Sequence, residues 1–240
     1  LDVARWALGN PALLPTRVMS FGGRWGYDDD GQTANNQMAY YDYAGGIPLL
    51  FDNRGLPMKD MNWTKGYEPV YRINGKVAAP RIGNVIHCEG GFVAEAKAYD
   101  HEGKTIHKFD NFQDGPDHMR NFIESVRAGK IIKDELHVAH GHHAAALAHL
   151  ANVSYRLGKT MSTDEVKERL SGSKAAVETL GDFFANLEAN KIDLSKDQPI
   201  VGPWLEFDPA SEKFIGEFAE EANKVAADEY AGGFELPKIG

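Results

Sequence analysis

The polar side chains that could do chemistry gather first in a loop near residue 25. Arg24 and Tyr27 lie there among three successive aspartates, residues 28–30, and glycines flank the loop. The planar donors of arginine and the acceptors of carboxylates suit the hydroxyls of a carbohydrate or polyol. A plain ion pair between Arg24 and a neighbouring aspartate is the alternative interpretation. The run does not fit a calcium loop, because the first ligand position would be Gly26 and the last Gln37.

A second group of candidate residues is a cluster of five histidines: His137, His140, His142, His143 and His149. On a helix His142 and His149 share one stripe, whereas His140 and His143 lie one turn apart on another. A zinc site needs a further ligand on the same face, and the cluster contains no His-Glu-x-x-His motif. We therefore expect no metal site here, and we expect His142 to contact a substrate.

Several cofactor and nucleophile motifs are missing from the sequence. No Gly-x-Gly-x-x-Gly fingerprint for a dinucleotide occurs. The Gly-Lys-Thr tripeptides at 103–105 and 158–160 lack the glycine that a phosphate-binding loop places five residues earlier. No Gly-x-Ser-x-Gly elbow is present, and Cys88 is the single cysteine. The chain is therefore expected to bind no nucleotide by itself and to support no nucleophilic catalysis.

The charge of the chain narrows the class of partner. It has 35 acidic and 26 basic residues among 240, a formal net charge of −9. Such an excess repels phosphate backbones and anionic lipid surfaces. No apolar run reaches the roughly 18 residues that a membrane span requires. We therefore expect neither nucleic acid nor a membrane as a partner.

The elements that must position these residues begin with strands. Short β-branched or aromatic runs bounded by Gly, Asn or Asp predict strands at residues 17–21, 37–43, 47–52, 84–88 and 92–96. Glycines at 45–46, 90–91 and 103 supply the positive φ of tight reversals, which predicts hairpins and an antiparallel sheet. Residues 57–80 are predicted to form a long loop.

Beyond residue 110 the hydrophobic period becomes helical. Met119, Phe122, Ile123 and Val126 recur at i, i+3, i+4 and i+7, which is typical of a core-facing stripe, and Gly129 can end that helix. Further helices are predicted over residues 136–157, from a capping box at Ser162 and Glu165 through Leu187, and over residues 212–230.

These elements predict one α+β domain over residues 1–240: an open, mainly antiparallel sheet with helices packed on one face. The first nine residues have the pattern of the last turns of a helix closed by Gly9. We expect that helix to begin upstream of Leu1.

Stretches spread over nearly the whole chain carry a family resemblance. They are residues 2–9, 22–31, 53–57, 86–91, 118–123, 141–158 and 202–208, and they include Gly-Gly-Arg-Trp-Gly-Tyr-Asp-Asp-Asp-Gly and Gly-Pro-Trp-Leu-Glu-Phe-Asp. They resemble the bacterial branch of the glucose-fructose oxidoreductase/inositol dehydrogenase (Gfo/Idh/MocA) family. The resemblance implies the C-terminal domain of that family, of the dihydrodipicolinate-reductase-like fold, without the N-terminal Rossmann domain.

The resemblance also implies a function. It points to the substrate-binding and oligomerisation domain of an oxidoreductase that moves hydride between NAD or NADP and a sugar or polyol. The cofactor would belong to the Rossmann domain of the full-length protein. The implied partners are that nucleotide-binding domain and further copies of the chain, paired through the sheet face. The implied location is cytoplasmic, or exported if a signal precedes the chain.

Carried over residue by residue, the resemblance implies substrate contacts at Arg24, Tyr27, Arg54, His118 and His142. The family's catalytic lysine, aspartate and histidine are expected before Leu1, so no catalytic residue is assigned in this chain and the isolated chain is expected to be inactive. Two alternatives stay open: an NAD-dependent glycoside hydrolase domain, as in some relatives, and a non-catalytic oligomerisation module.

Overall fold

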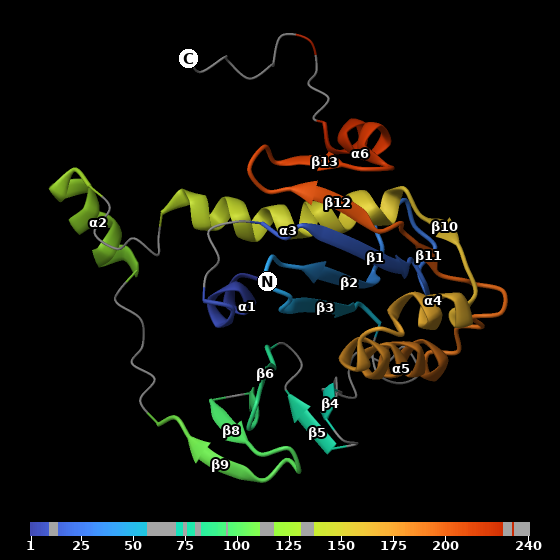
Figure 1. Ribbon diagram of the computed structural model, residues 1–240, viewed down its shortest axis with the longest axis horizontal. Helices are drawn as coiled ribbons and strands as arrows, with labels where there is room; N and C mark the ends of the chain where they lie inside the picture. The colour runs from blue at the N-terminus through green and yellow to red at the C-terminus, as the bar shows by residue number, and fades with distance from the viewer. Residues whose placement is uncertain are drawn as a thin grey trace.

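A seven-stranded antiparallel sheet forms the middle of the molecule (Figure 1). The computed structural model describes residues 1–9, 14–56, 71–73, 76–79, 83–94, 96–110, 118–130, 137–227 and 232. The three long strands are β1 (Arg17–Gly23), β2 (Asn36–Asp42) and β3 (Pro48–Arg54), paired in the order β3-β2-β1. Four short strands complete the sheet: β10 (Lys159–Thr160), β11 (Ile200–Val201), β12 (Leu205–Asp208) and β13 (Lys213–Ile215).

Strand β1 lies at the centre of this sheet. One of its edges pairs with β2 along its whole length, from Arg17 opposite Asp42 to Gly23 opposite Asn36. Its other edge is shared between β12, at the start of β1, and β11, near its end. The N-terminal strands and the C-terminal part of the chain are therefore joined at β1.

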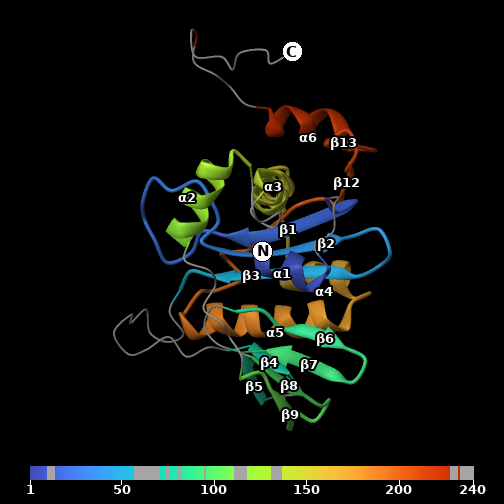
Figure 2. The same ribbon diagram turned by 90° about the vertical axis from the view of Figure 1, so that its left-hand side faces the viewer.

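Helices cover both faces of the sheet (Figures 1 and 2). The helices of one face are α1 (Asp2–Ala7), α3 (Val138–Arg156) and α6 (Ala219–Ala226), and those of the other are α4 (Thr163–Leu170) and α5 (Lys174–Ala189). Val18 belongs to the core under α3, whereas Met19 and Phe21 belong to the core under α5. Every residue of β1 after Arg17 is buried.

The predicted α+β class with an antiparallel sheet is confirmed, but helices were expected on one face only. Both alternating positions of β1 carry apolar side chains, and a strand with one face open to water would instead alternate apolar with polar residues. Among the described residues, helices thus cover both faces of the sheet at β1, the face expected to pair copies included. A homo-oligomer stays a prediction.

Two smaller sheets lie beyond β3 (Figure 2). One pairs β4 (Tyr71–Ile73) with β5 (Lys76–Ala79), inside the predicted loop, whose other residues up to Pro80 lie outside the described ranges. The other contains β6 (Ile86–Cys88), β7 (Gly91–Ala94), β8 (Lys97–Tyr99) and β9 (Thr105–Lys108). The predicted hairpins are confirmed, with positive φ at Gly45, Gly46, Gly91 and Gly103.

The helices follow their local signals at some ends and depart from the prediction at others. Helix α4 starts with the predicted capping box, in which Ser162 Oγ accepts from the N–H of Glu165 and the Glu165 carboxylate accepts from the N–H of Ser162. The helix predicted to continue to Leu187 is interrupted at residues 171–173, between α4 and α5. The region predicted as one helix from residue 212 holds β13 and the shorter α6.

None of the helices in the described ranges combines the length and apolar composition of a membrane span.

Helix α2 (His118–Ala128) projects beyond the start of α3 (Figure 1), and Gly129 follows it with φ +63°. Its predicted stripe, Met119, Phe122, Ile123 and Val126, was expected to face the core, yet these side chains are 44–65% exposed. The helix is amphipathic as predicted, but no part of the chain that the structure describes buries its apolar side. An exposed apolar cluster of this kind indicates an interaction surface.

The buried side chain of Ser154 joins α3 to the central strand β1 by a hydrogen bond. Its Oγ accepts a hydrogen bond from the N–H of Ser20 at 3.0 Å and donates to the carbonyl of Pro203 at 2.9 Å. Only glycine fits at the neighbouring position 202, because a Cβ there would lie 2.3 Å from the carbonyl oxygen of Ser154. One buried hydroxyl therefore holds a helix, a central strand and the C-terminal chain together.

Replacing Ser154 with Ala should lower the free energy of unfolding by about 1–3 kcal/mol, because the buried N–H of Ser20 loses its acceptor. Urea unfolding measures the change. Ser211→Ala is the matched control, since the Ser211 hydroxyl donates to Asp208 in an exposed turn, and it should cost about 0.5 kcal/mol or less. Equal losses in the two variants would contradict the role given to Ser154.

Candidate functional site

The end of β1, the start of β2 and the end of β3 lie side by side at one end of the seven-stranded sheet. Strand pairing places Gly23 opposite Asn36, and Asn36 opposite Arg54. The loop that carries Arg24 and Tyr27 follows β1 at this same end of the sheet. Three of the five predicted substrate contacts, Arg24, Tyr27 and Arg54, are therefore brought to one end of the sheet.

Arg24 uses its donors within its own loop. Its Nε and Nη2 donate to the two carboxylate oxygens of Asp29 at 2.7 and 2.5 Å, and Nη1 donates to the carbonyl of Thr33 at 3.2 Å. The hydrogen bonds from Arg24 are the main reason that the pKa of Asp29 lies below its ordinary value. The guanidinium lies against Gly31, where a Cβ would come within 2.1 Å of it. The alternative interpretation of Arg24, an ion pair with a neighbouring aspartate, is the one observed.

Trp25 anchors the same loop to the body of the protein. Its indole N–H donates to the carbonyl of Asp197 at 2.9 Å, and its ring meets that of Phe183 edge-on. Its backbone exchanges hydrogen bonds with the side-chain amide of Asn35 at 3.0 and 2.7 Å. Tyr27, whose ring lies 5.8 Å from the Arg24 guanidinium, is exposed on the anchored loop. Tyr27 is thus available to a ligand at the sheet end.

Asp52 and Arg54 form a largely buried ion pair on the last residues of β3. Their side chains are 16% and 10% exposed, and Nη2 of Arg54 donates to Oδ2 of Asp52. Within the described part of the chain, Oδ1 of Asp52 is buried with no hydrogen-bond partner. Burial raises the pKa of Asp52, Arg54 opposes this rise, and the nearby carboxylate of Asp182 adds to it. A carboxyl with a raised pKa and a free acceptor can exchange a proton or receive a ligand hydroxyl.

Helix α5 packs on β3 and adds polar side chains near the Asp52–Arg54 pair. Glu178, Asp182 and Asn186 share one side of the helix at i, i+4 and i+8. Asn186 Oδ1 accepts from Asn36 at 3.5 Å, and Asn36 Oδ1 accepts from the N–H of Gly55 at 2.8 Å. We call the group Asn36, Asp52, Arg54, Asp182 and Asn186 the sheet-end site. It combines a guanidinium, two carboxyls and two amides.

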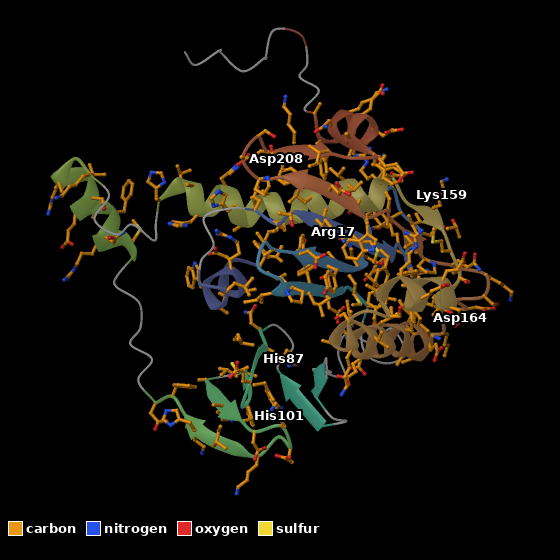
Figure 3. The ribbon with its side chains drawn as sticks, viewed as in Figure 1. Arg17, His87, His101, Lys159, Asp164 and Asp208 are labelled. Carbon is orange, nitrogen blue, oxygen red and sulfur yellow. The ribbon has the colours of Figure 1, made fainter. Side chains whose placement is uncertain are left out.

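A histidine from the four-stranded sheet, His87, lies toward helix α5. Figure 3 shows His87 on β6, the strand of that sheet next to β3 and α5. Partial desolvation lowers the pKa of His87, and the charge of Glu178 acts in the opposite direction. The four-stranded sheet therefore adds a titratable side chain near Glu178 of α5.

His142 lies at the opposite end of the sheet. The carbonyl of Leu147 accepts from the hydroxyl of Tyr41 at 2.9 Å, and Tyr41 pairs with Val18, so the first half of α3 covers the start of β1. His142 precedes Leu147, whereas Arg24 follows the far end of β1. Its Nε2 lies 2.9 Å from both carboxylate oxygens of Glu212. His142 is therefore not brought together with Arg24, Tyr27 and Arg54, and its contact with a substrate stays a prediction.

The remaining histidines near His142 belong to a joint between α1 and α3. Arg5 is fully buried and donates to the carbonyl of His140 and to Nδ1 of His143, each at 3.4 Å. Burial, followed by the charge of Arg5, lowers the pKa of His143.

No three His, Cys, Asp or Glu side chains within the described ranges converge as metal ligands would. His118, the other predicted contact, begins α2, and its side chain lies outside the described residues.

The prediction missed Asn36, Asp52, Asp182 and Asn186. A spacing of two residues in a strand already puts Asp52 on the same face as Arg54, so the pair could have been found. Nothing local could have shown Asp182, whose charge acts on Asp52 only because α5 packs on β3.

Comparison with known proteins does not identify a family. No protein-family model matches the chain, and neither the curated proteins nor the solved structures include a significant match. A function can therefore only be proposed, from the residues of the chain themselves.

The stability of the chain should depend on the protonation of Asp52. Because the pKa of Asp52 is raised by folding, the folded state binds its proton more tightly than the unfolded state, and the free energy of unfolding should fall as pH rises through that pKa. Arg54→Leu removes the opposing cation, so the fall should be larger and extend to higher pH. Urea unfolding between about pH 4 and 8 measures both.

Arg17→Leu is the matched control, because Arg17 forms an exposed pair with Asp42 at the other end of β1. It should leave the shape of the pH dependence unchanged. Identical pH profiles for wild type and Arg54→Leu would contradict the coupling of Asp52 to Arg54.

Proposed function

We propose that this chain is the substrate-binding domain of an NAD(P)-dependent oxidoreductase that acts on a sugar or polyol. The observation that carries the proposal is the Asp52–Arg54 pair, a largely buried carboxyl with a raised pKa beside a guanidinium, whose Oδ1 accepts no hydrogen bond from the residues that the structure describes. The stretches that resemble Gfo/Idh/MocA enzymes supply the reaction class.

Vicinal hydroxyls suit this pair. One hydroxyl donates to Oδ1 of Asp52 while its neighbour accepts from the Arg54 guanidinium, and both contacts are charge-assisted. Since Oδ1 is out of contact with solvent, neighbouring atoms must move aside as the ligand enters. Exposed Tyr27 adds an aromatic surface at the same end of the sheet. In this proposal the chain orients the hydroxyl-bearing carbon, and a nucleotide-binding domain supplies the nicotinamide that takes up hydride.

The exposed stripe of α2 supports the existence of such a partner domain. Its four apolar side chains would leave water on docking, at about 25 cal/mol per Å² of apolar area removed. The same stripe favours a second candidate function, an oligomerisation module in which another copy of the chain covers α2. The two candidates differ in the partner that binds.

Polyol binding to the full chain tests the site. Titration with myo-inositol, followed by NMR, should give saturable shifts of the backbone amides of residues 53–55. Asp52→Asn and Arg54→Gln should each weaken binding about tenfold or more, because each removes a charge-assisted hydrogen bond. Arg17→Gln should leave it unchanged. Wild-type amides that do not respond to myo-inositol, glucose or sorbitol would rule out this role for the pair.

Association through α2 is tested by sedimentation of the chain alone and with a nucleotide-binding domain of the same protein. The wild type should associate with that domain, and the double variant Phe122→Ser, Val126→Ser should lose the association because its apolar contact area is removed. Glu124→Gln, an exposed change on the same helix, is the control. Self-association of the wild type that is lost in the double variant, without binding of the domain, would instead establish the oligomerisation module.

A further inference from the structure

A groove of about 510 Å³ lies between α4, α5 and residues 194–198. Its volume is within the range of about 300–1,000 Å³ that is usual for small-molecule pockets. Its lining includes Thr163, Gly181, Phe184, Glu188, Ser195 and Gln198. We call it the α4–α5 groove. None of its lining residues belongs to the sheet-end site.

Gly181 is the unusual residue of this groove. It lies in the middle of α5, where glycine is less favourable than alanine. Its φ is not positive, and a Cβ at this position would meet no atom within 4 Å apart from its chain neighbours and the adjacent backbone of its own helix. Neither a turn nor a close backbone approach therefore accounts for glycine here. The missing side chain leaves open space over α5 beside Phe184.

The two groups at the rim that could attract an anion, the Lys167 ammonium and the N–H of Ser162, already have carboxylate partners. Lys167 Nζ donates to Asp164 at 3.0 Å, and the N–H of Ser162 at the start of α4 donates to Glu165 at 2.8 Å. Figure 3 shows Asp164 at the outer edge of the molecule. An anion would have to compete with these carboxylates, so the groove favours a neutral ligand.

The groups that remain suit hydroxyls. Thr163 and Gln198 offer both donors and acceptors, Glu188 offers a carboxylate, and the Ser195 hydroxyl, which donates to Asp193 at 2.6 Å, keeps acceptor capacity. Phe184 and Leu194 form an apolar floor. A ring with an apolar C–H side and hydroxyls around its rim matches both surfaces.

We propose that the α4–α5 groove binds a neutral monosaccharide in its pyranose form. The C–H side of the ring lies over Gly181 against Phe184, and its hydroxyls bond to Glu188, Ser195 and Gln198. Gly181 and Glu188 share one stripe of α5, while Asp182 and Asn186 of the sheet-end site lie on another. This site is additional to the proposed substrate site and does not depend on it.

Titration of the full chain with D-glucose, followed by NMR at the amides of Gly181 and Ser195, tests the groove. Saturable shifts are expected in the wild type. Gly181→Leu should abolish them without lowering the Tm, because its side chain fills the open space and removes a helical glycine. Gln198→Ala should weaken binding about tenfold. Gly172→Ala, at a glycine between α4 and α5 that also has no atom within 4 Å, should change nothing.

Two results would overturn the proposal: no saturable shift at these amides, or shifts that persist in Gly181→Leu. Equal affinity for acyclic sorbitol would overturn the assignment of a pyranose. Asp52→Asn separates the two sites, because it should leave glucose binding at Gly181 and Ser195 intact while it weakens binding at residues 53–55. Failure of one site is therefore distinguishable from failure of the other.

Discussion

Strand β1 contacts helices through both of its alternating sets of side chains, and the arrangement of the other elements follows from this two-sided burial. Val18 packs under α3, while Phe21 meets Phe183 of α5 edge-on, with ring centroids 5.6 Å apart. Neither helix alone would remove the strand from water. The C-terminal part of the chain must therefore return to β1, which it does by pairing β11 and β12 with the strand's second edge.

Two-sided burial leaves the ends of the strands, rather than a sheet face, for polar chemistry. The sheet-end site occupies such an end, where α5 passes over the last residues of β3. A charged pair in this layer costs desolvation that apolar residues would avoid. The ion pair between Asp52 and Arg54 compensates this desolvation cost only in part, because Oδ1 of Asp52 has no hydrogen-bond partner in the described structure. This uncompensated acceptor is why Asp52, rather than the internally paired Arg24, is the stronger candidate for ligand contact.

The sequence predicted those features that depend on neighbouring residues. Glycines with positive φ gave the hairpins around Gly45, Gly91 and Gly103, and Ser162 with Glu165 gave the start of α4. Short strands such as β10 and β11 could not be predicted, because two residues become a strand only through their partners.

The same limit applies to long-range contacts. The stripe on α2 correctly indicated an amphipathic helix, yet periodicity does not say what covers the stripe. The sequence allowed Arg24 to pair with any of three aspartates, and only the fold of its loop shows that the partner is Asp29; its contact with a substrate stays a prediction. Asp182 acts on Asp52 through packing between distant segments, which no local pattern contains.

The carboxyl ¹³C titration of Asp52, with and without saturating myo-inositol, tests the central claim most directly. Without ligand, the pKa of Asp52 should lie above its ordinary value because of burial. With ligand, it should fall, since a hydroxyl that donates to the carboxylate stabilises its charged form. An ordinary pKa that does not change on adding the polyol would contradict the assignment of Asp52 as the residue that receives the substrate hydroxyl.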